Sequence, residues 1–143
     1  MKKIILSLVV LAVGSASAQD LRDLVGYYAN SANTGSCPVS LNIEYYGTTN
    51  TLRITYHEGE TEDYAVGVGA YTEGDLKVEA TYNMNQMKVI TSAKNFWGKY
   101  KVIETTLLHK RDLSPFLRQQ RLSLSKTDRR GELTMFCTYS KYD

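Results

Sequence analysis

The sequence predicts an all-β fold: a single antiparallel up-and-down barrel of about eight strands with a short N-terminal helical turn. Apolar and polar residues alternate with a period of two along most of the chain, which is the pattern of half-buried strands. Turn residues interrupt this alternation at the even spacing typical of barrels and sandwiches. Only two prolines interrupt the backbone. A chain of this length can bury a sizeable core in one domain.

The first 18 residues have the pattern of a secretory signal peptide. A double lysine precedes an apolar run from Ile4 to Val13, and small residues lead to Ala18. The run is too short to cross a bilayer, which takes about 20 helical residues. We expect a signal peptide over 1–18, export to a bacterial periplasm or medium, and one β-barrel domain over 19–143 with no transmembrane segment. A retained N-terminal anchor is the alternative.

The elements are expected in the following order. Leu21, Leu24 and Val25 have helical spacing behind Asp20, a residue type that caps helices, and predict a helical turn that ends at Gly26. The alternation then predicts strands at 26–30, 40–46, 51–56, 63–71, 75–82, 87–91, 99–109, 118–126 and 133–139. Turns are expected at 47–50, at the acidic segment 57–63 and at Gly74–Asp75.

Gly67 and Gly69 lie inside the expected strand at 63–71. Glycine weakens strand pairing, but it permits the sharp bend or bulge that a small barrel needs. We expect bends here, and the alternative is a place where a ligand approaches the backbone.

Cys37 and Cys137 are the only cysteines. Because an oxidising compartment preserves disulfides, we expect the two to pair, and two free thiols are the alternative. The Cα atoms of a disulfide lie within about 7 Å of each other. The bond would therefore hold the beginning of the sheet beside its last strand, as in an up-and-down barrel, although a two-sheet sandwich also fits. Neither His57 nor His109 has zinc-ligand spacing from a cysteine.

The chain has a helical turn, then Gly26 and Tyr28 on the first strand, then a disulfide from Cys37 to Cys137 in a late strand. This pattern resembles the lipocalin and wider calycin families. The resemblance implies a ligand-binding barrel that carries a small apolar molecule. The chain departs from the family pattern at Tyr28, where lipocalins usually have tryptophan. It also lacks an arginine on the final strand, since two arginines lie in the preceding turn instead.

The charges divide between two halves of the chain. From Gln19 to Ala80 there are ten acids and three bases, a balance of −7, and from Thr81 to Asp143 five acids and twelve bases, a balance of +7. In a meander these halves form opposite walls, and a basic wall could bind phosphates, anionic glycans, lipid headgroups or an acidic protein. The candidate partner- or anion-binding residues are Lys110, Arg111, Arg118, Arg121, Arg129 and Arg130. The alternative is that they are solvated loop charges.

Eleven tyrosines and a single tryptophan make up most of the aromatic residues. Tyrosine suits cavity linings and binding surfaces because it has an apolar ring and a hydroxyl group, but it is also a common strand residue. The candidate ligand-binding residues are Tyr28, Tyr45, Tyr56, Tyr64, Tyr82 and Trp97. We expect Trp97 between two strands at a rim of the barrel.

Catalysis and metal binding find little support. There is no Gly-x-Ser-x-Gly motif, neither histidine belongs to a recognisable constellation, and the acidic segment 57–63 lacks the oxygen spacing of a calcium loop. We therefore expect no enzyme, no metal, no cofactor and no nucleic-acid partner. The leading hypothesis is an exported, monomeric binding protein that holds a small apolar or amphipathic ligand in its barrel. The second is a protein-interaction module, such as an inhibitor of a hydrolase, with charged loops and a filled core.

Overall fold

The structure is a computed structural model that describes residues 21–30, 37–111, 113–123 and 132–142. The expected signal peptide and the arginines at 129 and 130 lie outside these residues. The described residues form one sheet of ten strands. The strands are β1 (Gly26–Asn30), β2 (Ser40–Tyr46), β3 (Thr51–Tyr56), β4 (Thr61–Ala65), β5 (Tyr71–Glu73), β6 (Leu76–Asn83), β7 (Gln86–Lys94), β8 (Tyr100–Lys110), β9 (Phe116–Ser123) and β10 (Glu132–Tyr142).

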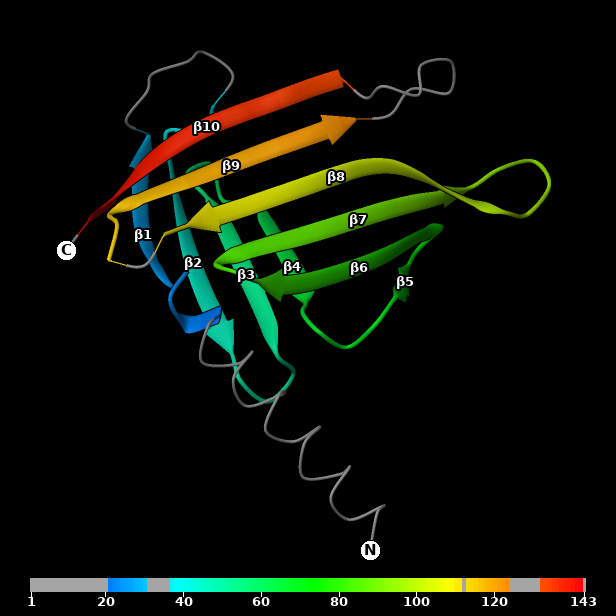
Figure 1. Ribbon diagram of the computed structural model, residues 1–143, viewed down its shortest axis with the longest axis horizontal. Coiled ribbons are helices and arrows are strands. Elements are labelled where there is room, and N and C mark those ends of the chain that lie inside the picture. The colour runs from blue at the N-terminus through cyan, green and yellow to red at the C-terminus, as the bar shows by residue number, and fades with distance from the viewer. Residues whose placement is uncertain (1–20, 31–36, 112, 124–131, 143) are drawn as a thin grey trace, which may run out of the picture.

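The strands follow one another as an antiparallel meander whose first and last strands are neighbours. The order in the sheet is β4-β3-β2-β1-β10-β9-β8-β7-β6-β5 (Figure 1). Tyr28 of β1 is opposite Leu41 of β2 on one side and Lys141 of β10 on the other. The all-β meander and the pairing of its first and last strands are thus confirmed.

Closure and strand count differ from the prediction. Among the described residues there are ten strands rather than about eight, in part because the segment expected as one strand at 63–71 is divided at Gly67 and Gly69, whose φ angles are 73° and 84°. The two glycines are therefore bends, since positive φ is readily available to glycine. The bend separates β4 from β5, and a parallel bridge between Val66 and Ala80 joins the two sides of this gap. The sheet is a curled half-barrel rather than a closed barrel.

The expected N-terminal helical turn is not shown. Residues 21–25 form a turn in which the amides of Leu24 and Val25 donate to the carbonyls of Leu21 and Arg22, both at 3.1 Å. Leu21 and Arg22 have helical geometry, but the helical part of the described chain ends there. Among the described residues, no helix is long and apolar enough to cross a membrane.

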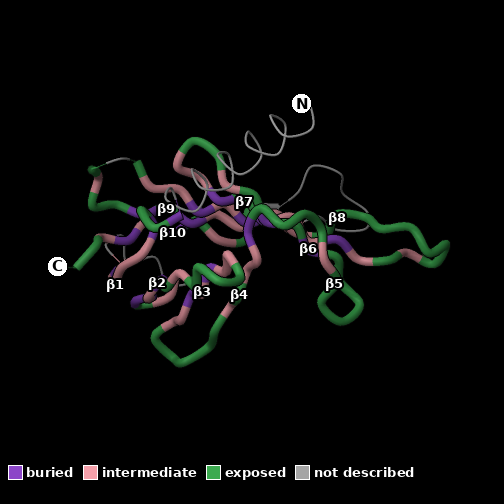
Figure 2. The backbone as a smooth tube through the Cα atoms, turned by 90° about the horizontal axis from the view of Figure 1, so that it is seen from below, coloured by how far each residue is buried: buried purple, intermediate pink, exposed green. Residues whose placement is uncertain are grey.

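The core lies between the two halves of the curled sheet. Figure 2 shows β1–β4 along one side and β7, β9 and β10 along the other, with buried segments between them. The alternation of the sequence places one face of each strand in this interior. Its fully buried aliphatic side chains include Leu41, Ile43, Leu52, Ile54, Met87, Leu108 and Leu117. The acidic residues of β2–β4 belong to one half and the basic residues of β7–β10 to the other, but Glu73 of β5 and Glu79 of β6 lie in the same half as those bases.

Candidate functional site

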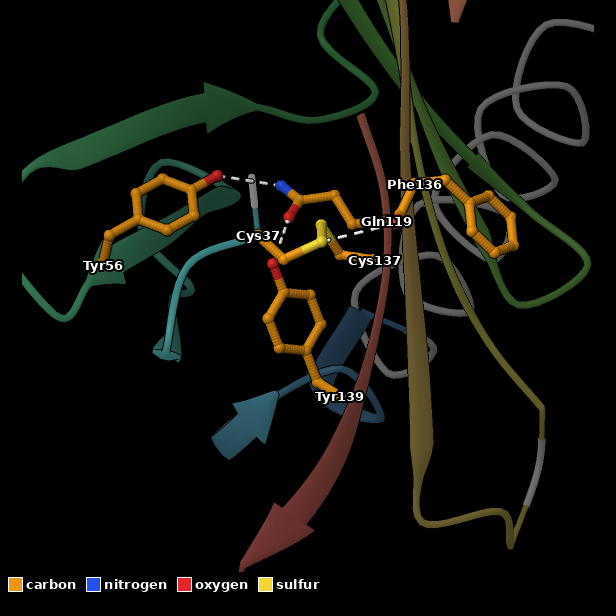
Figure 3. The surroundings of a disulfide bond; sticks show 6 residues. All are labelled: Cys37, Tyr56, Gln119, Phe136, Cys137 and Tyr139. Carbon is orange, nitrogen blue, oxygen red and sulfur yellow. Dashed lines mark hydrogen bonds between the residues drawn. A yellow bond between two sulfur atoms is a disulfide. The ribbon is translucent and has the colours of Figure 1, made fainter. Parts of the chain in front are cut away.

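A disulfide joins the connection between β1 and β2 to the last strand. Cys37 and Cys137 are bonded, with their Cα atoms 5.7 Å apart and a sequence separation of 100, which confirms the predicted pairing. Cys137 is fully buried. Figure 3 also shows a contact between Cys37 Sγ and the carbonyl oxygen of Phe136 at 3.4 Å, which is no true hydrogen bond because a disulfide sulfur carries no proton.

Beside the disulfide, one buried glutamine connects two tyrosines from opposite halves of the sheet (Figure 3). The hydroxyl of Tyr139 donates to Oε1 of Gln119 at 2.9 Å, and Nε2 of Gln119 donates to the hydroxyl of Tyr56 at 2.8 Å. Gln119 has no exposed surface. Its amide is fully buried but hydrogen-bonded at both ends, which offsets the cost of its desolvation.

Next along β9, an arginine enters the same interior and meets a carboxylate of β4. Nη2 of Arg121 donates to Oε1 and Oε2 of Glu62 at 3.1 and 3.2 Å, and the hydroxyl of Tyr64 donates to the same carboxylate. Nε of Arg121 is 3.6 Å from Oε1 of Glu104, too far for a hydrogen bond, and has no hydrogen-bond partner among the described residues. Glu62 is therefore the principal partner of this guanidinium group.

The electrostatics of this cluster follow from burial and from Glu62. Burial, and then the charge of Glu62, raise the pKa of Tyr56 to about 12. The same two causes raise the pKa of Tyr64. Burial, the largest single influence, acts to lower the pKa of Arg121, but the charge and hydrogen bonds of Glu62, together with the charges of Tyr56 and Glu104, outweigh it, and this pKa is raised. At neutral pH the tyrosines are thus neutral hydrogen-bond donors and the guanidinium is charged.

A half-open pocket of about 340 Å³ lies at the end of the sheet where β3 turns into β4, and Tyr56, Glu62 and Arg121 of this cluster line it. Its apolar lining comes from Cys37, Pro38, Val39, Tyr56 and Met135. Its polar lining comes from His57, Glu58, Glu60, Glu62 and Arg121. We call this the disulfide pocket. It lies within the size range of small-molecule sites, about 300–1,000 Å³, and combines an apolar surface with a few charged groups, as such sites do.

The candidate ligand-binding tyrosines lie in different parts of the interior. Tyr56 lines the disulfide pocket, whereas Tyr28 is fully buried in the core and its hydroxyl donates to the Leu24 carbonyl at 2.9 Å. Tyr45, Tyr64 and Tyr82 are partly buried against the same core. Trp97 lies apart from all of them, in the connection between β7 and β8, and is 80% exposed.

The candidate anion-binding residues also separate. Arg111 and Arg118 line a pocket of about 400 Å³ together with His109, Ser114, Phe116 and Thr138. Lys110 of β8 is opposite Leu117 of β9, next to the pair of His109 with Arg118. Arg121 lies in the disulfide pocket, paired with an acid, rather than with the other bases. Among the described residues, no group of three or more His, Cys, Asp or Glu side chains could hold a metal ion.

Gln119 and the pairing of Arg121 with Glu62 were not among the features expected from the sequence. A signal for both was present, because Leu117, Gln119 and Arg121 share the inward phase of β9. Polar residues in the phase of a buried leucine predict a hydrogen-bonded or paired interior group. Their partners, however, are distant in the sequence.

Comparison of the chain with protein-family models, with curated proteins and with solved structures finds no significant match.

Proposed function

We propose that this chain is an exported, non-enzymatic binding protein that holds a small amphipathic ligand in the disulfide pocket. The observation that carries the proposal is the lining of the pocket. The apolar surface of Tyr56, Met135 and Val39 would contact the body of the ligand, and the glutamates of the β3–β4 turn would contact its polar end.

The charges of the pocket favour a ligand with a cationic or hydrogen-bond-donating end. Glu62 is already paired with Arg121, whereas the carboxylates of Glu58 and Glu60 have no hydrogen bond or ion pair to another described side chain. Two unpaired carboxylates beside an apolar surface attract an amine or ammonium group. The proposed ligand is therefore a small molecule with an apolar body and an amine-bearing end.

The resemblance to lipocalins agrees with this proposal, because a curled antiparallel sheet has a concave inner face that suits a carrier of small molecules. Export to an oxidising compartment is part of the same proposal. It is supported by the disulfide, since such bonds persist outside the reducing cytosol.

The experiment is native mass spectrometry of the mature protein purified from its own exported compartment, followed by denaturation and identification of released small molecules. Wild-type protein and Glu60→Gln would be compared with Val39→Trp, which fills the pocket from a side chain that is 65% exposed. The matched control is Val68→Trp, at a side chain that is 56% exposed and outside the pocket lining.

A bound amine that is retained in Val68→Trp, weakened in Glu60→Gln and lost in Val39→Trp would support the proposal. A bare wild-type protein, or a ligand that survives Val39→Trp unchanged, would contradict it. In either of those cases the protein-interaction module becomes the better hypothesis.

A further inference from the structure

The hairpin formed by β7 and β8 extends beyond the rest of the sheet. The last pair between β8 and β9 is Glu104 with Ser123, so β8 residues 100–103 are paired only with β7 in the described part of the chain. At about 3.3 Å per residue, β8 extends about 13 Å past its last described pair with β9. On the other side, β6 accompanies β7 as far as the pair of Leu76 with Ala93, so the part that projects beyond β6 is Lys94 and the turn at 95–99. Figure 1 shows the hairpin reaching past the ends of β6 and β9.

The turn at the end of this hairpin is ordered by one asparagine. Oδ1 of Asn95 accepts hydrogen bonds from the amides of Trp97 and Lys99, at 3.0 and 2.9 Å. The Asn95 amide donates to the Lys99 carbonyl at 2.7 Å, and Gly98 adopts a φ of 77°. The side chain of Asn95 adds to the backbone hydrogen bonds that close the turn, so the conformation of the tip is set before any partner binds.

Two large aromatic side chains stand on this ordered turn. Phe96 is 94% exposed and Trp97 is 80% exposed. Their rings contact each other edge to face, with centroids 5.5 Å apart. Because an exposed aromatic pair gains nothing from the protein core, its position at a projecting tip indicates a contact surface.

Lysines flank this aromatic pair in the sequence. The segment 94–101 contains Lys94, Lys99 and Lys101 and no acid. The amino groups of Lys94 and of Lys77 on β6 lie over the Tyr100 ring, at 5.4 and 5.3 Å from its centroid. By register, Glu73 of β5 is level with Leu76, Ala93 and Lys101, so this acid lies beside the base of the tip and not beside the turn that carries Phe96 and Trp97.

We propose that the β7–β8 tip docks the protein on an anionic lipid surface, with Phe96 and Trp97 inserted among the headgroups and the lysines against lipid phosphates. Aromatic rings with lysine partners are typical of residues at a membrane interface, and each lysine near an anionic leaflet contributes to binding. A convex tip suits a soft surface that closes around it, whereas a protein partner would need a matching cavity. This surface is separate from the disulfide pocket and does not depend on its ligand.

The test uses the fact that Trp97 is the only tryptophan of the chain, so its fluorescence reports directly on the tip. The mature protein is titrated with vesicles of phosphatidylcholine, and with vesicles in which phosphatidylglycerol replaces part of it. We expect a blue shift of the emission and quenching by brominated lipid with the anionic vesicles, and a weaker response at high salt.

Two variants keep the fluorescent reporter and separate the two contributions. Phe96→Ser is expected to lower the partition coefficient about tenfold, because it removes one of the two inserted rings. The triple change Lys94→Gln, Lys99→Gln and Lys101→Gln is expected to lower it by about fivefold per charge. The matched control is Met84→Ser in the turn at the opposite end of β7, where the side chain is 86% exposed.

Binding that falls in the tip variants and is unchanged in Met84→Ser would support lipid docking. No emission change with either kind of vesicle would overturn it, as would an equal loss in Met84→Ser. A blue shift that requires an acidic protein, with none on vesicles, would also overturn it and would assign the tip to a protein partner.

Discussion

Glu62 and Asp63 are neighbours in the sequence, but the two carboxylates form ion pairs of different kinds. Asp63 points to the outer face of β4 and accepts two hydrogen bonds from Arg53 of the adjacent strand, at 2.8 and 2.9 Å. The hydrogen bond from Arg53 lowers the pKa of Asp63. Glu62 points to the inner face and pairs with Arg121 of β9, a strand distant in the sheet order.

The comparison shows that good geometry and structural importance are different properties. The outer pair, Arg53 with Asp63, has shorter hydrogen bonds, but both its side chains are more than 40% exposed, so water competes for the same groups. The inner pair, Arg121 with Glu62, has longer hydrogen bonds, but its side chains are only 22% and 26% exposed, respectively. Loss of either inner partner leaves a charge in a poorly hydrated interior, which is more costly than loss of an exposed pair.

The largest expected effect comes from the disulfide that borders the inner pair. The double change Cys37→Ser and Cys137→Ser opens a loop with a sequence separation of 100. The free energy of unfolding is expected to fall by about 4 to 5 kcal/mol, because the unfolded chain gains entropy. Urea unfolding with and without reductant measures this. Equal midpoints in the two conditions would contradict a structural disulfide.

The second effect distinguishes the two arginines directly. Arg121→Met is expected to lower the free energy of unfolding by about 2 to 3 kcal/mol, since Glu62 keeps its charge inside the pocket without a cation. Arg53→Met, the matched change on the outer face, is expected to leave the urea midpoint within error, and high salt should remove any difference. Similar losses in the two variants would show that the inner environment has no special role.

The last effect, a pH dependence of the inner cluster, appears only in alkaline solution. Tyr56 has a pKa of about 12 in the folded state, above its ordinary value of 10, because of burial and then Glu62. The unfolded tyrosine therefore loses its proton first as pH rises. The stability that Tyr56 contributes is complete below pH about 10 and is lost between about 10 and 12.

Tyr56→Phe has no such proton to lose, so its unfolding free energy should fall less steeply over this window, by about 1.4 kcal/mol per pH unit. Urea unfolding measured at a series of pH values tests this. A slope identical to that of the wild type would mean that Tyr56 titrates alike in the folded and unfolded states.

The outer pair could be predicted from the sequence and the inner pair could not. The turn was expected over 57–63, but β4 begins at Thr61. Once the turn is limited to 57–60, Arg53 and Asp63 are opposite each other on β3 and β4, which is the register observed. The length of a turn does not relate Glu62 to Arg121 in this way, because their strands are not adjacent in the sheet. Likewise, the inward phase of Gln119 was visible along β9, but its contacts with Tyr56 and Tyr139 depend on strands from both halves.

By itself, the sequence determined most of the strands and turns and the cysteine pairing. These depend on local patterns of period two, on turn residues and on the number of cysteines. The tertiary structure decided how far the sheet curls, that it stays open between β4 and β5, and which side chains meet across the interior. The reason is physical: curvature is the sum of small twists over many strands, so no single segment of the sequence specifies it.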